Sequence, residues 1–244
     1  MSLLRLLLQL ATCPIGTQAA SLDIAKAYRN SPIIPDHKRY LAILWRGHVY
    51  IQHVAIEGLA TAGGIQGTVA DVCIQILAHH GIHPVIEWVV NFVFFREPSI
   101  SAQPLPHAFP YDLTDVFSVT KPLGIPWHSI SKKGQDFAPH FDYVGFSWDI
   151  AKRSVTVPDE KRLHAIAKLR LVLSTSTLSC CDIASIHGTL QHLTFFYRDG
   201  RHSLSSLSNF LANFPNDFIK HHLPMHTCSD LLWWQSLLTR PNIS

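Results

Sequence analysis

The stretch that decides the fold is residues 87–95, which read Glu87-Trp88-Val89-Val90-Asn91-Phe92-Val93-Phe94-Phe95. Apolar residues dominate it, many of them β-branched or aromatic, and the apolar character reaches back to Val85. A short run of this kind is typical of a strand that is buried on both faces. We therefore expect a buried strand or hairpin over 85–95.

The flanking segments predict strands with one helix first and helices alone afterwards. Strands are expected at 22–28, 40–45, 48–54, 141–148 and 154–157, with Arg46-Gly47 as a hairpin turn. Helices are expected at 68–80, 113–119, 158–173, 182–197, 204–213 and 230–238, and four glycines within 58–67 predict a loop before the first of them. This order indicates an α+β domain over 1–157, followed by a helical region over 158–244.

Composition limits the class of protein. Of the 244 residues, 47% are hydrophobic and only 15% are charged, which excludes a disordered chain and predicts that a neighbour covers part of the surface. The five cysteines show no C-x-x-C spacing and no disulfide framework of a small secreted domain, which favours a reducing compartment and hence the cytoplasm or nucleus. A leucine-rich start split by Arg5 makes secretion the less favoured alternative. No apolar run approaches the ~20 residues of a membrane span.

Asp23 stands where an apolar strand is expected to end, and two interpretations remain open. An aspartate there commonly caps a turn, which is the favoured reading of this residue taken alone. It could also be a metal ligand, because carboxylates at the ends of adjacent strands can converge on two divalent ions ~4 Å apart and support phosphoryl transfer. Spacing does not choose between these interpretations.

Several segments, taken in order, resemble a reverse transcriptase. The palm of that family is matched by Asp23-Ile24-Ala25-Lys26-Ala27-Tyr28-Arg29, by Gly58 to Gly67 and by Trp88 to Arg96. Farther along, Tyr143-Val144-Gly145-Phe146 resembles the segment that holds the primer end, and residues 187–201 resemble the helical thumb side. The chain looks most like tyrosine-recombinase (DIRS-type) retrotransposons, with Ty3-like elements behind them. The resemblance implies a palm, with an antiparallel sheet and packed helices, and then a thumb-like region.

The resemblance also implies roles for single residues. Asp23 matches the first metal-binding aspartate, and Tyr28 lies where a ring favours deoxynucleotides, a role that is compatible with a core tyrosine. Glu57 and Gly58 match the loop beneath template and nucleotide, but Glu57 departs from the glutamine or phenylalanine usual in the family. The implied cofactor is Mg²⁺, and the implied partner is an RNA/DNA primer–template.

The main departure from the family is at Val90 and Asn91, where two adjacent aspartates are expected. Valine offers a metal no side-chain oxygen and asparagine offers one neutral oxygen. Valine also resists positive φ, so we expect the hairpin to be distorted or partly straightened. Other acids (Asp71, Asp112 and Asp115) are expected to lie on helix surfaces or to act as caps. The sequence therefore predicts a degenerate copy with weak or lost Mg²⁺ binding and no polymerase activity.

Two further features concern partners. Residues 121–170 contain nine basic and five acidic residues, including the doublets Lys152-Arg153 and Lys161-Arg162, which indicate either a phosphate-binding stripe or an ordinary solvated face. The resemblance covers neither the fingers region nor the ribonuclease H portion of the family, which implies a palm–thumb fragment. Two alternatives to a degenerate polymerase remain: a nucleic-acid-binding module without catalysis, and an expressed relic without function.

Overall fold

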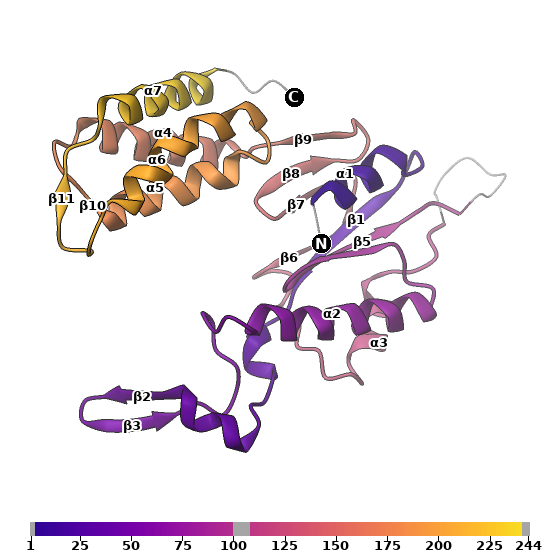
Figure 1. The fold of residues 1–244 in the computed structure, drawn as a ribbon. Helices are drawn as coiled ribbons and strands as arrows, with labels where there is room; N and C mark the ends of the chain where they lie inside the picture. Colours follow the sequence, from indigo (N-terminus) through magenta and orange to yellow (C-terminus); the bar gives the residue numbers. More distant parts are fainter. Residues whose placement is uncertain (1–2, 100–107, 241–244) are drawn as a thin grey trace. The chain divides into compact units, whose positions relative to one another are not determined.

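The computed structural model describes residues 3–99 and 108–240. The chain divides into two compact units, Met1–Ser154 and Val155–Ser244. The first unit combines strands and helices, whereas helices dominate the second (Figure 1). The expectation of a mixed α and β chain is therefore confirmed.

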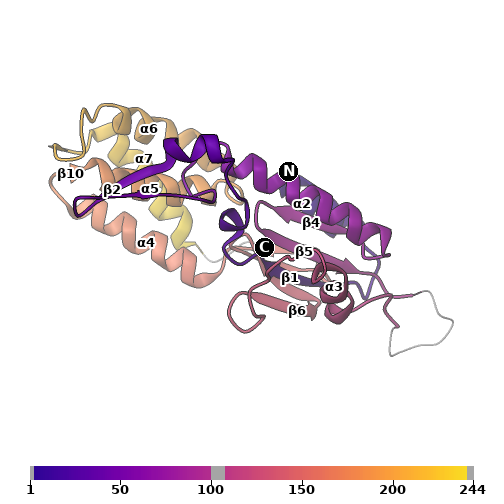
Figure 2. The ribbon, with the colours of Figure 1, turned by 90° about the horizontal axis from the view of Figure 1, so that it is seen from below.

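The first unit is built on a four-stranded antiparallel sheet in the order β4-β5-β1-β6, which Figure 2 shows side by side. The strands are β1 (Gln18–Asp23), β4 (Val85–Trp88), β5 (Asn91–Arg96) and β6 (Gly134–Ala138). Phe92 and Phe94 of β5 and Leu22 of β1 belong to one buried cluster with residues of α2 (Ala62–His79) and α3 (Leu113–Thr120). The predicted hairpin over 85–95 is therefore present and buried.

Helix α2 begins six residues earlier than the predicted start at Thr68. Gly63, Gly64 and Gly67 thus lie inside the helix, and the predicted glycine loop over 58–67 is wrong for its second half. Ala62 and Gln66 explain the early start, because they are one helical turn apart and both buried. Packing of this face outweighs the low intrinsic helix propensity of glycine.

Residues 140–149 form a hairpin and not the single strand expected over 141–148. Strand β7 (His140–Tyr143) pairs with β8 (Phe146–Asp149) across a two-residue turn. In that turn φ is 49° at Val144 and 81° at Gly145, the left-handed conformation that matches the twist of paired strands. A short strand, β9 (Ser154–Thr156), lies at the boundary between the units. Several elements were not predicted, among them β6 and the N-terminal helix α1 (Leu3–Thr12).

A second hairpin, β2 (Ala42–Trp45) and β3 (His48–Ile51), confirms the turn predicted at Arg46-Gly47. It forms its own two-stranded sheet, and every residue of both strands is exposed. Two 3₁₀ segments, η1 (Ala27–Asn30) and η2 (Pro35–Leu41), join β1 to this hairpin.

The second unit is a set of four helices around an apolar core. They are α4 (Asp159–Ser174), α5 (Cys180–Leu193), α6 (Ser205–Ala212) and α7 (Met225–Thr239), with η3 (Arg198–Leu204) and the two-residue strands β10 (Leu178–Ser179) and β11 (Lys220–His221). Leu169, Leu190 and Trp234 are fully buried between them. All four helices were predicted, although α7 starts five residues early. Within the described ranges, no helix has the length and apolar character needed to cross a membrane.

Candidate functional site

The ends of β1 and β5 bring Asp23, Val90 and Asn91 together. Asp23 pairs directly with Asn91 in the β1–β5 register, so both side chains lie on one face of the sheet. Next to them, the Ile24 amide donates to the Val90 carbonyl oxygen at 3.0 Å. The structure thus places the remaining carboxylate beside the two positions where the sequence departs from the reverse-transcriptase pattern.

A histidine and a lysine side chain face the Asp23 carboxylate. His128 Nε2 is 3.6 Å from Oδ1 and Lys133 Nζ is 3.7 Å from Oδ2, while the Asp23 side chain is only 15% exposed. The His128 backbone amide also donates to the Asp23 carbonyl oxygen at 2.9 Å. Sequence reasoning missed both residues, because they come from a loop far along the chain that no local motif marks.

The donor set at this site does not fit a pair of magnesium ions. Mg²⁺ requires several hard oxygen ligands in near-octahedral geometry, whereas the residue paired with Asp23 in the sheet is the neutral Asn91 and the nearby Glu87 carboxylate is bonded to the Val89 amide. Lys133 would moreover repel a cation placed at Asp23. Across residues 3–99 and 108–240, no cluster of three or more histidine, cysteine, aspartate or glutamate residues is arranged to hold a metal ion.

The other acids considered from the sequence serve as expected. Asp112 caps α3 and accepts hydrogen bonds from the amides of Thr114 and Asp115, at 2.7 and 3.2 Å. Asp115 accepts the Asp112 amide in return, which completes a capping box. Asp71 is exposed on α2. These three side chains thus have the capping and surface positions predicted for them.

The turn between β4 and β5 is tight and locally strained. Val89 has φ of 60°, and the Val90 amide donates to the Trp88 carbonyl oxygen at 2.7 Å, which closes a three-residue γ-turn. Glu87 Oε2 accepts the Val89 amide at 2.9 Å. The strands remain paired as far as Trp88 and Asn91. The expected partial straightening is therefore wrong, and the distortion is confined to one valine.

The segment that resembles a primer grip forms a hydrogen bond to this hairpin through Tyr143. The Tyr143 hydroxyl donates to the Asn91 carbonyl oxygen at 2.9 Å, and the Tyr143 side chain is buried. Burial raises the pKa of Tyr143 above its ordinary value, and the Glu87 carboxylate raises it further, so the phenol stays neutral. Phe146 is also buried, and Gly145 occupies the left-handed turn position.

The residues that resemble a nucleotide site differ in exposure. Tyr28 is half-buried in η1, five residues after Asp23, and the adjacent Ala27 belongs to the core cluster. Glu57 and Gly58 are both exposed in the loop before α2. Gly58 has φ of 89°, a conformation that few other residues adopt, so this glycine is required by the turn.

The residues of the two basic doublets differ in the ion pairs and hydrogen bonds that they form within the protein. Lys152 Nζ lies 3.5 Å from Asp149 Oδ2 and remains largely exposed, as does Arg153. Arg162 bonds to Asp159 at 2.9 Å and to the Leu238 carbonyl oxygen at 2.9 Å, so its guanidinium is used inside the helical unit.

Lys161 contributes to a groove of about 510 Å³ between α4 and α5, together with His164 and Lys168. Lys168 Nζ is held by the hydroxyls of Ser185 and Thr189, at 3.0 and 3.1 Å. These hydrogen bonds fix one ammonium group at the groove, while the Lys161 side chain is exposed to solvent.

Comparison with known proteins identifies the fold. No protein-family model matches the chain, and no curated protein matches its sequence. Solved structures of the foamy viral protease-reverse transcriptase do match. The complex with RNA/DNA hybrid gives a TM-score of 0.58 at 16% identity, over 91% of this chain and 27% of that chain. The dRH form with ds DNA gives 0.55 at 16% identity, over 95% and 37% of the two chains.

A third structure, the same viral protein with dsDNA, gives a TM-score of 0.53 at 17% identity, over 95% of this chain and 44% of that chain. The present chain thus spans less than half the length of each of these chains. At this level of identity the likeness concerns the fold alone. The chain has a reverse-transcriptase-like fold.

Proposed function

We propose that this chain is a reverse-transcriptase-like palm and thumb that binds a primer–template duplex and does not synthesise DNA. The solved structures of similar fold are complexes with RNA/DNA hybrid or DNA, which supports a nucleic-acid partner. In this proposal residues 1–157 are the palm and residues 158–244 are the thumb-like region. The segment resemblances support descent from a retrotransposon, of the DIRS or Ty3-like type.

The proposed loss of catalysis rests on the surroundings of Asp23. Its carboxylate faces His128 and Lys133. Val90 and Asn91 lie beside it in place of further carboxylates. Two-metal phosphoryl transfer needs several carboxylates to hold and neutralise the ions. If the missing charges weaken transition-state stabilisation by about 5 kcal/mol, the rate falls by roughly four orders of magnitude. The ion pair between Lys133 and Asp23 adds to this loss, because a metal would have to displace Lys133.

The α4–α5 groove supports the nucleic-acid-binding part of the proposal. Lys161, His164 and Lys168 line one concave surface together with one carboxylate, Glu160, and the two lysine amines in such a position attract phosphate groups. Lys152 and Arg153 add exposed positive charge in the first unit. Arg162 is assigned a structural role here, because Asp159 and a backbone carbonyl already occupy its guanidinium.

Binding is tested by titrating a fluorescent primer–template duplex with purified protein at several salt concentrations. A protein that neutralises phosphates loses affinity linearly in log–log salt plots, with a slope of about 0.9 per contact. We expect Lys161→Gln to reduce that slope by about one contact. Lys220→Gln, at another exposed lysine of the same unit, is the matched control and should leave the slope unchanged. Salt-independent binding, or equal effects of the two variants, would reject this surface.

Loss of catalysis is tested by restoring the missing acids. Val90→Asp with Asn91→Asp recreates the paired carboxylates beside Asp23. If Mg²⁺-dependent primer extension returns in this variant and is abolished by adding Asp23→Asn, the missing charges were the main lesion. Continued inactivity of the restored variant, with duplex binding intact, would place the lesion elsewhere, for example at Glu57.

A further inference from the structure

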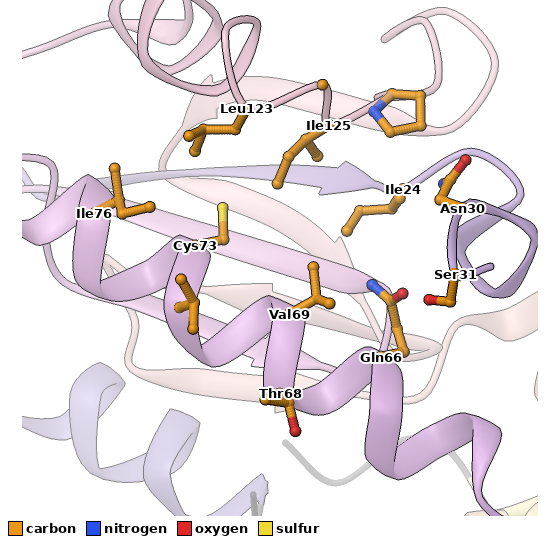
Figure 3. A pocket seen from close by; sticks show the side chains of 13 residues that line it. Ile24, Asn30, Ser31, Gln66, Thr68, Val69, Cys73, Ile76, Leu123 and Ile125 are labelled. Atoms are coloured by element: carbon orange, nitrogen blue, oxygen red, sulfur yellow. The ribbon is translucent and has the colours of Figure 1, made fainter. Parts of the chain in front are cut away.

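The first unit contains a cavity of about 420 Å³ between α2 and residues 123–126. Figure 3 shows Val69 and Cys73 of α2 on one side, Ile125 on the other and Ile24 closing one end. Cavities of this size are in the range that holds small organic ligands. None of the residues that line it carries a charge. Burial raises the pKa of the Cys73 thiol to about 11, so this wall is also neutral at physiological pH.

A buried polar group points into this apolar space. Gln66 is only 3% exposed, and its carboxamide is directed toward the cavity in Figure 3. Within the described part of the chain, no residue forms a hydrogen bond with this side chain. The amide atoms of Gln66 are not among the described buried side-chain atoms that lack a hydrogen-bond partner, so they face the water-accessible space of the cavity. The Gln66 carboxamide can therefore form hydrogen bonds with a ligand that enters the cavity in place of water.

The chemistry of the lining restricts that ligand. A carboxamide presents one donor and one acceptor side by side, a pattern that matches the N6 amino group and N7 of adenine. Ile24, Val69 and Ile125 supply aliphatic surfaces on which a flat ring can pack. Ser31 and Asn30 lie at the end nearest Gln66, where polar groups attached to the ring would meet them. The absence of charge in the lining disfavours a phosphate group.

We propose that this cavity binds the adenine ring of a neutral nucleoside, held by two hydrogen bonds to the Gln66 carboxamide and packed between Ile24, Val69 and Ile125. This site is separate from the proposed duplex-binding surface. It recognises its ligand through an amide and aliphatic side chains, whereas the duplex-binding surface relies on lysines.

The test uses the full chain and adenosine as the probe, with binding followed by calorimetry and by ligand-observed NMR. We expect saturable binding that Gln66→Leu weakens by about tenfold or more, because both hydrogen bonds are lost. Gln75→Leu makes the same change at an exposed position of the same helix and should leave affinity unchanged. Thermal unfolding of both variants establishes that they are folded.

A second test changes the ligand and leaves the protein unaltered, so misfolding of a variant cannot affect its result. In 7-deazaadenosine the N7 acceptor is missing, so it should bind the unaltered protein more weakly than adenosine and should lose less on Gln66→Leu. A short adenosine oligonucleotide separates a free nucleoside from a base within nucleic acid. The proposal is overturned if adenosine does not bind, if adenosine and 7-deazaadenosine bind equally, or if only the oligonucleotide binds.

Discussion

The strained turn at Val89 gives a quantitative prediction. Val89 has φ of 60°, whereas the following residue, Val90, is not among the residues with positive φ. An L-residue in the left-handed region costs roughly 1–2 kcal/mol because its β-carbon approaches the following carbonyl oxygen. Glycine avoids this cost, but it loses about 0.5–1 kcal/mol relative to alanine through the entropy of the unfolded chain. Comparing alanine with glycine at each position isolates the β-carbon.

At position 89 we expect Val89→Gly to be more stable than Val89→Ala by about 0.5–1 kcal/mol, the strain relieved less the entropy lost. At position 90 the order should reverse, with Val90→Gly less stable than Val90→Ala by about 0.5–1 kcal/mol. The entropic cost of glycine is the same at both positions. Subtracting the glycine–alanine stability difference at position 90 from that at position 89 therefore gives the backbone strain at Val89, about 1–2 kcal/mol. Urea unfolding followed by tryptophan fluorescence measures all four variants.

The reasoning is refuted if glycine destabilises position 89 relative to alanine by as much as it does position 90. In that case the backbone of Val89 would not be strained, and the γ-turn would not be the state of the hairpin in solution.

Three further changes test other contacts. Gly200→Ala should destabilise the helical unit by about 1–3 kcal/mol, measured by thermal unfolding, because a β-carbon there would overlap the buried Trp234 ring. Tyr143→Phe should cost about 1–3 kcal/mol in urea unfolding, since it leaves a carbonyl oxygen of the hairpin without its donor. Asp182→Ala should cost about 0.3–1.5 kcal/mol at neutral pH, because Asp182 completes the cap of α5 with Ser179. Hydrogen bonds from Ser179 lower the pKa of Asp182 in the folded protein. The stabilisation by this carboxylate is therefore full above the unfolded pKa of ~3.9 and is lost as the pH falls through the lower folded pKa. The difference in unfolding free energy between the unaltered protein and Asp182→Ala should accordingly shrink in acid.

Much of the β architecture follows from local sequence. The apolar run at 85–95 and the Arg46-Gly47 turn predicted two hairpins, both of which the structure contains. The neighbouring positions of Asp23 and Asn91 follow once their strands are placed side by side in an antiparallel sheet. These features depend on the pattern of a few adjacent residues, which a single sequence displays directly.

Other features depend on contacts between distant segments. The Val144-Gly145 turn was missed because β-branched valine disfavours positive φ, and only the pairing of Tyr143 with Phe146 enforces it. His128 and Lys133 reach Asp23 because β6 returns beside β1, a path that no local pattern reveals. The same holds for Gln66, whose glycine-rich surroundings predicted a loop and not a buried helical position.

The most direct test of the central claim is primer extension on a duplex that the protein has already bound. Purified protein is saturated with labelled primer–template, and Mg²⁺ and all four deoxynucleoside triphosphates are then added in a single-turnover assay. We predict that the duplex remains bound and the primer stays at its original length. Extension that requires Mg²⁺ and disappears in the Asp23→Asn variant would contradict the account.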